Sequence, residues 1–183
     1  KIIEECAEAH GVEYKGKKVG SIGDIGTFSF YANKTFTCGE GGMVVTNSKE
    51  FAEKAKSLKN LAYGKINRFL HDDIGFNYRL PNISAAIGLA QFLQREKIFS
   101  EKKRIYERYK KNLKNLKGLK IPLIKEWTTK YIMWVFNVYL DNNFPITRDE
   151  LVKKMHDENI ETRNAFVPIN KQEILIKKYG LFN

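Results

Sequence analysis

One lysine, Lys34, lies within the stretch GTFSFYANKTFTCGEGGMVV, whose other residues are mostly aromatic, small or β-branched. Lysine rarely lies in such surroundings, because removing its charge from water is unfavourable unless the charge is paired or lost. Where the surroundings keep the amine partly neutral, it is a nucleophile that can form a Schiff base. Two other interpretations are open: a solvated lysine on a turn, and a lysine that binds phosphate beside a glycine-rich loop.

The glycine-rich run Gly-Glu-Gly-Gly begins five residues after Lys34 and leads into the apolar run MVVT. It lacks the spacing of a Walker phosphate loop and does not precede a helix, which weakens the phosphate interpretation. Its glycines, Gly39, Gly41 and Gly42, let the backbone double back close to the lysine without side-chain clashes. On spacing alone, the solvated turn is the default interpretation for any single lysine.

Short apolar runs around Lys34 predict strands, because glycines or charges bound each of them. The runs are Ile2-Ile3, which precedes the acidic pair Glu4-Glu5, TFSFY and MVVT. The glycine-rich segment EYKGKKVGSIGDIG between the first two runs predicts a hairpin or loop. Helical spacing of apolar residues predicts three helices. The first is capped by Asn47 together with Glu50, and the second starts at Pro81, near Asn82. The third ends before Gly118 and carries Ile105, Tyr109, Leu113 and Leu116.

The sequence pattern changes after Gly118. KYIMWVFNVYL predicts the strongest strand in the chain, Thr147 with Glu150 predicts the capping box of a further helix, and NIETRN predicts extended structure. We expect a domain boundary near residues 97–115, between a first part built as an α/β layer and a small α+β second part.

The composition is that of a folded globular protein, with 43% hydrophobic and 13% aromatic residues in a chain of 183. No apolar run is long enough to cross a bilayer and no signal-peptide pattern is present, so we expect a cytoplasmic protein. Cys6 and Cys38 make no disulfide framework, and reduced thiols are expected. The three histidines, His10, His71 and His156, are scattered, so no metal site is expected.

The net charge of +11, from 32 Lys+Arg and 21 Asp+Glu, suits nucleic acid, acidic membranes or phosphorylated ligands. Much of the excess lies in EKKRIYERYKKNLKNLKGLK, whose helical spacing is typical of a solvated helix face. The chain offers no aromatic platform or recognised nucleic-acid motif. We therefore expect no nucleic-acid and no membrane partner, and a phosphate-bearing ligand is favoured.

Three segments, EECAEAHG, GDIGTFSFYANKTFTCGEGGMVVTN and GFNYRLPNISAAIGLAQ, closely resemble in this order the pyridoxal-phosphate-dependent sugar aminotransferases of the DegT/DnrJ/EryC1/StrS family. The resemblance is specific from Ile2 to about residue 95 and looser to the end, where IETRNAFVPINKQ looks like the family's substrate-side segment. It implies the type I, aspartate-aminotransferase-like α/β fold. Residues 1–100 would be the C-terminal part of the large cofactor-binding domain, and residues 101–183 an incomplete small C-terminal domain.

The resemblance implies a role for four of these residues. Lys34 takes the position of the lysine that forms the internal aldimine with pyridoxal 5'-phosphate and then moves a proton between cofactor and sugar. Ser29 matches the serine that contacts the cofactor phosphate. Asn77 in GFNYR matches the asparagine that reaches the phosphate of the neighbouring subunit's cofactor, and Arg79 is placed at the same interface. Without the resemblance, Ser29 is a strand serine bonded to backbone and Asn77 a turn residue.

Two glutamates complete the implied cofactor site. The family usually has aspartate at the position of Glu5, where a carboxylate keeps the pyridine nitrogen protonated and so makes the ring a better electron sink. Glutamate is one methylene longer, so the ring or the strand must shift to accommodate it. Glu8 matches a position near the ring's phenolic oxygen. His10 also matches the family's pattern, and the resemblance places it near the substrate or the subunit interface without assigning it a role. A histidine that is simply packed in the core is an equal alternative.

The implied activity is transfer of an amino group from glutamate to the 4-keto carbon of a nucleotide-linked 4-keto-6-deoxy sugar, by a homodimer with shared active sites. Lysine rather than histidine at position 34 favours this over the related branch that removes a hydroxyl group. Amination at C3, or of a UDP- or dTDP-linked sugar, stays open. Outside the enzyme class, a cofactor-free regulatory relative and a basic nucleic-acid-binding module are the alternatives.

The chain begins without Met, on what we interpret as a core strand. We therefore expect a piece of a longer protein. The resemblance implies that the missing N-terminal portion carries a helix N-terminus that holds the cofactor phosphate and an aromatic residue that stacks on the ring.

Overall fold

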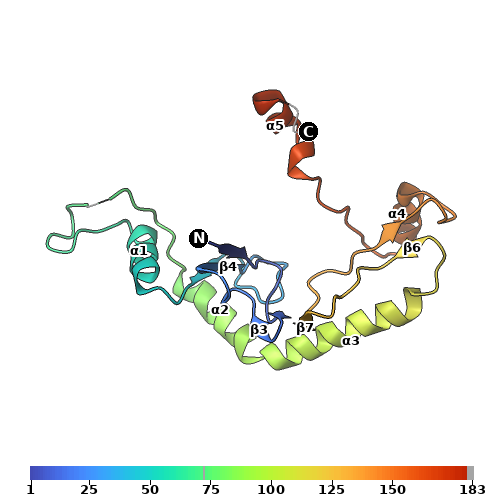
Figure 1. Ribbon diagram of the computed structural model, residues 1–183, viewed down its shortest axis with the longest axis horizontal. Coiled ribbons are helices and arrows are strands. Elements are labelled where there is room, and N and C mark those ends of the chain that lie inside the picture. The colour runs from blue at the N-terminus through green and yellow to red at the C-terminus, as the bar shows by residue number, and fades with distance from the viewer. Residues whose placement is uncertain (72, 181–183) are drawn as a thin grey trace. The chain divides into compact units, whose positions relative to one another are not determined.

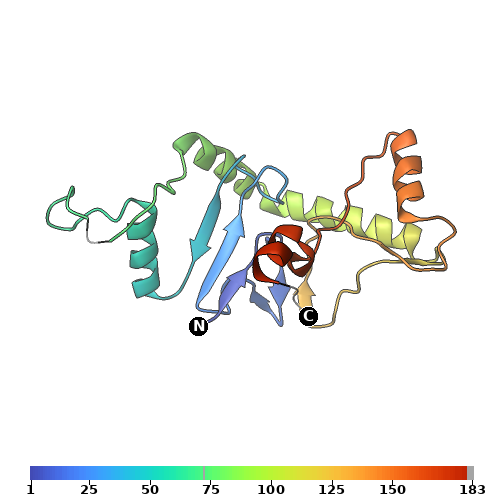
Figure 2. The same ribbon diagram turned by 90° about the horizontal axis from the view of Figure 1, so that it is seen from above.

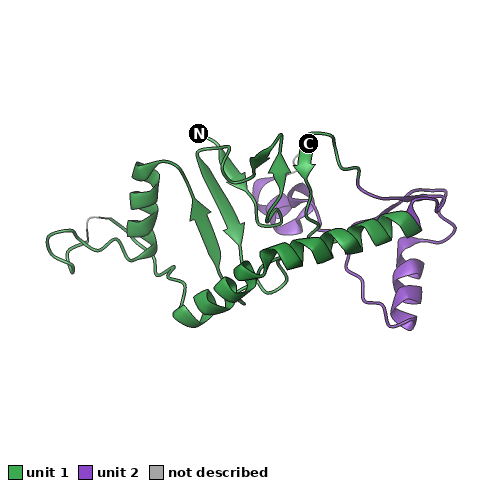
Figure 3. Ribbon diagram, turned by 90° about the horizontal axis from the view of Figure 1, so that it is seen from below, with its two compact units in different colours: residues 1–112, 123–136 green, residues 113–122, 137–183 purple. Residues whose placement is uncertain are grey.

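The computed structural model describes residues 1–71 and 73–180 and divides into two compact units. The first unit comprises residues 1–112 and 123–136, and the second comprises residues 113–122 and 137–183 (Figure 3). Every residue predicted for the site belongs to the first unit. Within the described residues, no helix is both long and apolar enough to cross a membrane.

The central sheet of the first unit has the strand order β1-β4-β5, formed by Ile3–Glu5, Ile25–Ser29 and Gly42–Val45 (Figures 1 and 2). β1 runs parallel to β4, and β5 runs antiparallel to it. These are the three strands predicted around Lys34. The carboxyl ends of the two parallel strands therefore lie at the same edge of the sheet, where α/β proteins commonly bind ligands.

A second small sheet pairs segments that lie far apart in the sequence. β2 (Glu13–Tyr14) and β3 (Lys17–Lys18) form the predicted hairpin, whose turn residues Lys15 and Gly16 have φ of 49° and 76°. β7 (Thr128–Lys130) pairs antiparallel with β2. This pairing brings the segment that follows β7 back to the first part of the chain.

The first unit contains α1 (Lys49–Lys59), α2 (Asn82–Leu93) and, except for its last residue, α3 (Arg95–Leu113). The predicted cap of α1 was wrong by one residue, because the hydroxyl of Ser48, not Asn47, accepts the N–H of Phe51 at 3.3 Å. α2 begins after Pro81 as predicted. α3 ends at Leu113, so Leu116 lies beyond the helix.

The buried core of the first unit joins three segments distant in sequence. Phe36 from the loop after β4, Phe99 from α3 and Ile132 from the segment after β7 form one apolar cluster, with Val12 and Ile98 packed against it. Because apolar burial is the main stabilising term in folding, this cluster fixes the loop that carries Lys34 relative to α3 and residues 131–134.

The strand predicted over KYIMWVFNVYL was largely wrong. Only its ends pair, as part of β7 and as β8 (Tyr139–Leu140), and residues 131–138 have irregular backbone. Ile132 and Met133 are both buried although they are neighbours, which the alternation of a strand with one buried face does not allow. Two of the apolar residues, Ile132 and Met133, therefore reflect burial rather than strand pairing, and Val135 and Val138 are exposed.

The second unit contains the pair β6 (Leu119–Lys120) and β8, which run antiparallel. The predicted capping box at Thr147 is confirmed at the start of α4 (Arg148–Asp157): the Thr147 hydroxyl accepts the N–H of Glu150 at 3.3 Å, and the Glu150 carboxylate accepts the N–H of Thr147 at 2.8 Å. A short 3-10 helix η1 (Ile169–Lys171) and the helix α5 (Glu173–Tyr179) follow.

Candidate functional site

Lys34 lies in the loop between β4 and β5, at the carboxyl end of β4. Backbone hydrogen bonds close the base of this loop, because Phe30 N donates to the Gly41 carbonyl at 2.8 Å and Cys38 N to the Phe30 carbonyl at 3.0 Å. Lys34 N also donates to the Tyr31 carbonyl at 3.0 Å. The loop is thus a fixed part of the fold, not a freely moving turn.

The side chain of Lys34 is only 10% exposed and its charge is compensated. Its ammonium group forms an ion pair with the carboxylate of Glu8, from the turn that follows β1. The same nitrogen lies 4.4 Å from the centre of the Trp134 ring. This arrangement contradicts the interpretation of Lys34 as a solvated turn lysine.

Trp134 is the residue at this site that sequence reasoning missed. Its indole N–H donates to the carbonyl of Asn33 at 2.9 Å, although the two residues are 101 positions apart. The aromatic run KYIMWVFNVYL is the only signal for it in the sequence, and its pattern predicts a strand. Nothing local in that run indicates a partner near residue 34.

The two glutamates of the acidic pair have different environments, because strand alternation places them on opposite faces of the sheet. The Glu4 carboxylate accepts the backbone N–H groups of Gly20 at 2.8 Å, Ile22 at 2.7 Å and Gly23 at 2.6 Å. Although burial acts to raise the pKa of Glu4, these three hydrogen bonds together lower it. The Glu4 carboxylate therefore has a structural role, because its hydrogen bonds stabilise the loop that precedes β4.

Glu5 shares its face of the sheet with Ser29, since Glu5 is in register with Thr27 and Ser29 follows two residues later. The Glu5 side chain is exposed and accepts one hydrogen bond, from Ala7 N at 2.8 Å. The Ser29 hydroxyl accepts Tyr31 N at 3.3 Å. The Glu5 carboxylate and the Ser29 hydroxyl can each form a further hydrogen bond with a ligand at the edge of the sheet where β1 and β4 end.

His10 is 5% exposed and lies among three aromatic rings. Its ring centre is 5.6 Å from that of Phe28, 5.8 Å from Phe30 and 5.6 Å from Phe36. Within the described part of the chain, neither ring nitrogen has a hydrogen-bond partner. Burial, and secondarily the charge of Lys34, lowers the pKa of His10 from its ordinary value of 6.5. His10 is thus a neutral imidazole packed beside the lysine loop.

This burial predicts a pH-dependent stability. Below a pH of about 6.5 the unfolded chain binds a proton on His10 that the folded chain resists, so the free energy of unfolding falls as the pH falls from that value. In His10→Leu the corresponding part of the pH dependence is expected to disappear, because an apolar side chain has nothing to protonate. Urea unfolding at pH 7.5 and 5.5 measures the difference.

His156→Leu is the matched control for this measurement, since His156 is exposed on α4. It should leave the fall in stability between the two pH values as in the wild type. An equal fall in the wild type and in His10→Leu would show that other groups cause the pH dependence.

Asn77 and Arg79 lie apart from these residues in the chain, on the exposed segment between α1 and α2. Asn77 forms an isolated antiparallel bridge with Asn60, and the Arg79 guanidinium donates to the Asn60 side-chain oxygen at 3.0 Å. Both side chains are exposed. The structure therefore gathers Glu8 and Lys34, places Glu5 and Ser29 on one face, and leaves Asn77 and Arg79 available for a partner.

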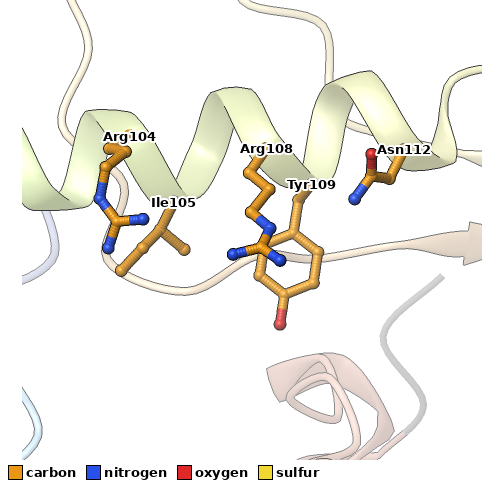
Figure 4. A pocket seen from close by; sticks show the side chains of 5 residues that line it. All are labelled: Arg104, Ile105, Arg108, Tyr109 and Asn112. Atoms are coloured by element: carbon orange, nitrogen blue, oxygen red, sulfur yellow. The ribbon is translucent and has the colours of Figure 1, made fainter.

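A pocket of about 330 Å³ lies along α3, and it is lined by Arg104, Ile105, Arg108, Tyr109 and Asn112 (Figure 4). None of these residues was predicted for the site. One of its two arginines, Arg104, is already paired with Glu101 at 2.7 Å. Over residues 1–71 and 73–180, no three histidine, cysteine, aspartate or glutamate side chains gather into a possible metal site.

Comparison with known sequences gives a consistent result. The sequence profile of the DegT/DnrJ/EryC1/StrS aminotransferase family matches residues 1–181. A GDP-perosamine synthase of Escherichia coli O157:H7 is 42% identical over 179 residues, which cover 97% of this chain and 48% of the relative. A GDP-perosamine synthase of Vibrio cholerae is 43% identical over 168 residues, covering 91% and 45%. The chain spans about half the length of the curated relatives it matches.

A solved structure has the same fold. The Helicobacter pylori aminotransferase involved in the biosynthesis of pseudoaminic acid matches with a TM-score of 0.88 and 25% identity, over 99% of this chain and 49% of that one. The predicted mixed α/β class is thereby confirmed, and it is shared with a sugar aminotransferase over about half of that protein's length.

Proposed function

Because the chain belongs to the DegT/DnrJ/EryC1/StrS aminotransferase family, we propose that the whole protein transfers an amino group to a nucleotide-linked keto sugar with pyridoxal 5'-phosphate as cofactor. The observation that carries the proposal is Lys34, whose side chain is only 10% exposed and is paired with Glu8 in the loop that follows β4. A largely shielded, paired lysine beside exposed polar groups at the carboxyl edge of parallel strands is an arrangement typical of a ligand site in α/β proteins.

The residues present suit this cofactor. Lys34 would hold its aldehyde carbon, the Ser29 hydroxyl would contact its phosphate, and the Glu5 carboxylate would pair with its pyridine nitrogen. Glu5 and Ser29 share one face of the sheet, and within residues 1–71 and 73–180 the Glu5 carboxylate accepts one hydrogen bond, so it has capacity for a further partner. When bound, the cofactor supplies an electron sink for the carbon that loses a proton.

The chain's own groups would then divide the proton transfers. Lys34 must lose a proton before its nitrogen can attack, and the Glu8 carboxylate in contact with that nitrogen is the nearest acceptor. The same amine would carry a proton to and from the substrate carbon. Glu8 is therefore proposed as the proton partner of Lys34 as well as a neighbour of the cofactor's phenolic oxygen.

We assign residues 1–100 to the C-terminal part of a type I large domain and residues 101–183 to part of a small C-terminal domain. Support comes from the match to a sugar aminotransferase over about half of its length. The cytoplasm is the proposed location, and the support for it is membership of this aminotransferase family.

The proposed substrate is a GDP-linked 4-keto-6-deoxy sugar, with glutamate as amino donor and perosamine as the product, for use in polysaccharides such as O-antigen. The support is the identity to two GDP-perosamine synthases, at 42% and 43%. Incubating the whole protein with glutamate and a panel of GDP-, UDP- and dTDP-linked keto sugars tests this. Amination at C3, or a preference for a UDP- or dTDP-linked sugar, would contradict the assignment.

We also propose a homodimer whose cofactor sites are shared, because Asn77 is exposed and matches a residue that the family donates across the interface. Mixing a Lys34→Ala chain with an Asn77→Ala chain should restore activity, since each mixed dimer contains one site free of both changes. Random mixing predicts roughly a quarter of the wild-type activity. Measured on the whole protein, no recovery despite demonstrated mixed dimers would exclude sharing through Asn77.

A further inference from the structure

We propose that Trp134 is a positioning residue for Lys34, which holds the reacting amine in place together with Glu8. The inference rests on the proposed function, because it takes Lys34 as the reacting amine. Its basis is the contact at 4.4 Å between the Lys34 nitrogen and the Trp134 ring centre. An ammonium group over the face of an indole ring is attracted by the ring's negative face, and tryptophan is the best residue for this contact.

The Trp134 ring is held in a defined orientation relative to Lys34. Its indole N–H donates to the Asn33 carbonyl at 2.9 Å, and that carbonyl belongs to the peptide bond directly before Lys34. The ring therefore binds the backbone of the lysine loop with its edge and the lysine side chain with its face. Movement of the ring would break both contacts, so the two reinforce one another.

The backbone of Trp134 is also fixed to the rest of the first unit. Its carbonyl accepts the Lys102 ammonium group of α3 at 3.2 Å, and burial lowers the pKa of Lys102. Two residues earlier, Ile132 is 4% exposed in the cluster with Phe36 and Phe99. Trp134 is thus part of a rigid framework rather than a mobile cover over the lysine.

The consequence concerns the freedom of the lysine side chain. A free lysine samples many rotamers, and each cycle that releases its amine would let it move away from the reacting atoms. With the Glu8 carboxylate and the Trp134 ring both in contact with the nitrogen, the amine keeps one position. Holding a reacting group in the productive geometry is a recognised source of rate enhancement.

Chemical labelling of lysines in the full chain without added cofactor tests the positioning role. In Trp134→Leu, acetic anhydride should modify Lys34 about threefold to tenfold faster than in the wild type, as measured by mass spectrometry, because the ring contact is lost. Trp134→Phe keeps an aromatic face but loses the N–H donor, so it should show a smaller increase. Trp127→Phe, which replaces the only other tryptophan, is the matched control and should show none.

Fluorescence gives a readout that a merely structural role would not change. In a Trp127→Phe chain, Trp134 is the only tryptophan, and Lys34→Met should raise its emission because a neighbouring ammonium group quenches indole. In a Trp134→Phe chain, Lys34→Met should leave the emission of Trp127 unchanged. Urea unfolding curves identify any variant that has lost its fold.

The outcomes separate this inference from the proposed function. Equal labelling of Lys34 in the wild type and in a folded Trp134→Leu chain, or an unchanged emission of Trp134, would overturn the positioning role. The proposed function is tested independently by adding pyridoxal phosphate and borohydride to the wild type. Absence of a pyridoxyl adduct on Lys34 would reject that function, whereas faster labelling in Trp134→Leu would still support the contact.

Discussion

Lys34→Arg is expected to lose transamination by about 10³-fold or more, because the amine acts both as nucleophile and as the carrier of a proton. Arginine keeps the positive charge and can still pair with Glu8, but its guanidinium cannot be deprotonated in proteins and so cannot attack an aldehyde. The substitution therefore separates covalent chemistry from simple phosphate binding, which arginine would support. Initial rates of the whole protein with glutamate and keto sugar measure the loss.

Lys54→Arg is the matched control, since Lys54 is also paired with a carboxylate, that of Asp73, but on an exposed surface. It should retain the wild-type rate. Mass spectrometry after borohydride reduction should place the pyridoxyl adduct on the peptide that contains Lys34. An adduct on a different lysine, or substantial activity in Lys34→Arg, would show that the assignment of the reacting amine is wrong.

Glu5→Gln is expected to slow proton abstraction by on the order of 10²-fold while changing cofactor affinity far less. A neutral amide cannot stabilise a protonated pyridine nitrogen, so the ring would accept electrons less well. Glu5→Asp should be tolerated, because aspartate is the residue that the family usually has at this position. Single-turnover rates with a deuterated amino donor isolate the proton-abstraction step.

Glu4→Gln is the informative contrast, because it makes the same chemical change one residue away on the opposite face of the sheet. It should leave the chemical step unchanged and lower the free energy of unfolding by roughly 1–3 kcal/mol, since the carboxylate accepts three backbone N–H groups. Near-normal turnover in Glu5→Gln would make Glu5 a structural carboxylate and end its assignment to the pyridine nitrogen.

Short-range patterns in the sequence were enough to predict several local features correctly. The strands around Lys34, the hairpin at residues 13–18 and the capping box at Thr147 all follow from residues close together in the chain. Each depends on turn chemistry, side-chain periodicity or a cap, and these act over a few residues. The family motifs lie in the same short segments, which is why the candidate lysine could be identified from them.

Other features depended on contacts between residues far apart in the sequence. The sequence named Glu4 and Glu5 as an acidic pair, but only the folded loop at residues 20–23 shows that the Glu4 carboxylate is already bonded. The segment 131–138 resembled a strand because it is rich in apolar residues, yet only Ile132 and Met133 are buried and none of the segment pairs as a strand.

The surroundings of Lys34 also combine features that local sequence predicts with contacts that only the tertiary structure provides. The sequence identified Lys34 as a lysine among apolar residues. From spacing alone, Lys34 could be a solvated turn residue, a phosphate-binding residue or a Schiff-base residue. The folded chain brings Glu8 from one strand end and Trp134 from 100 residues away to the same nitrogen. Such a contact arises from the packing of Phe36, Phe99 and Ile132, which are distant in the chain, so no local pattern could have predicted it.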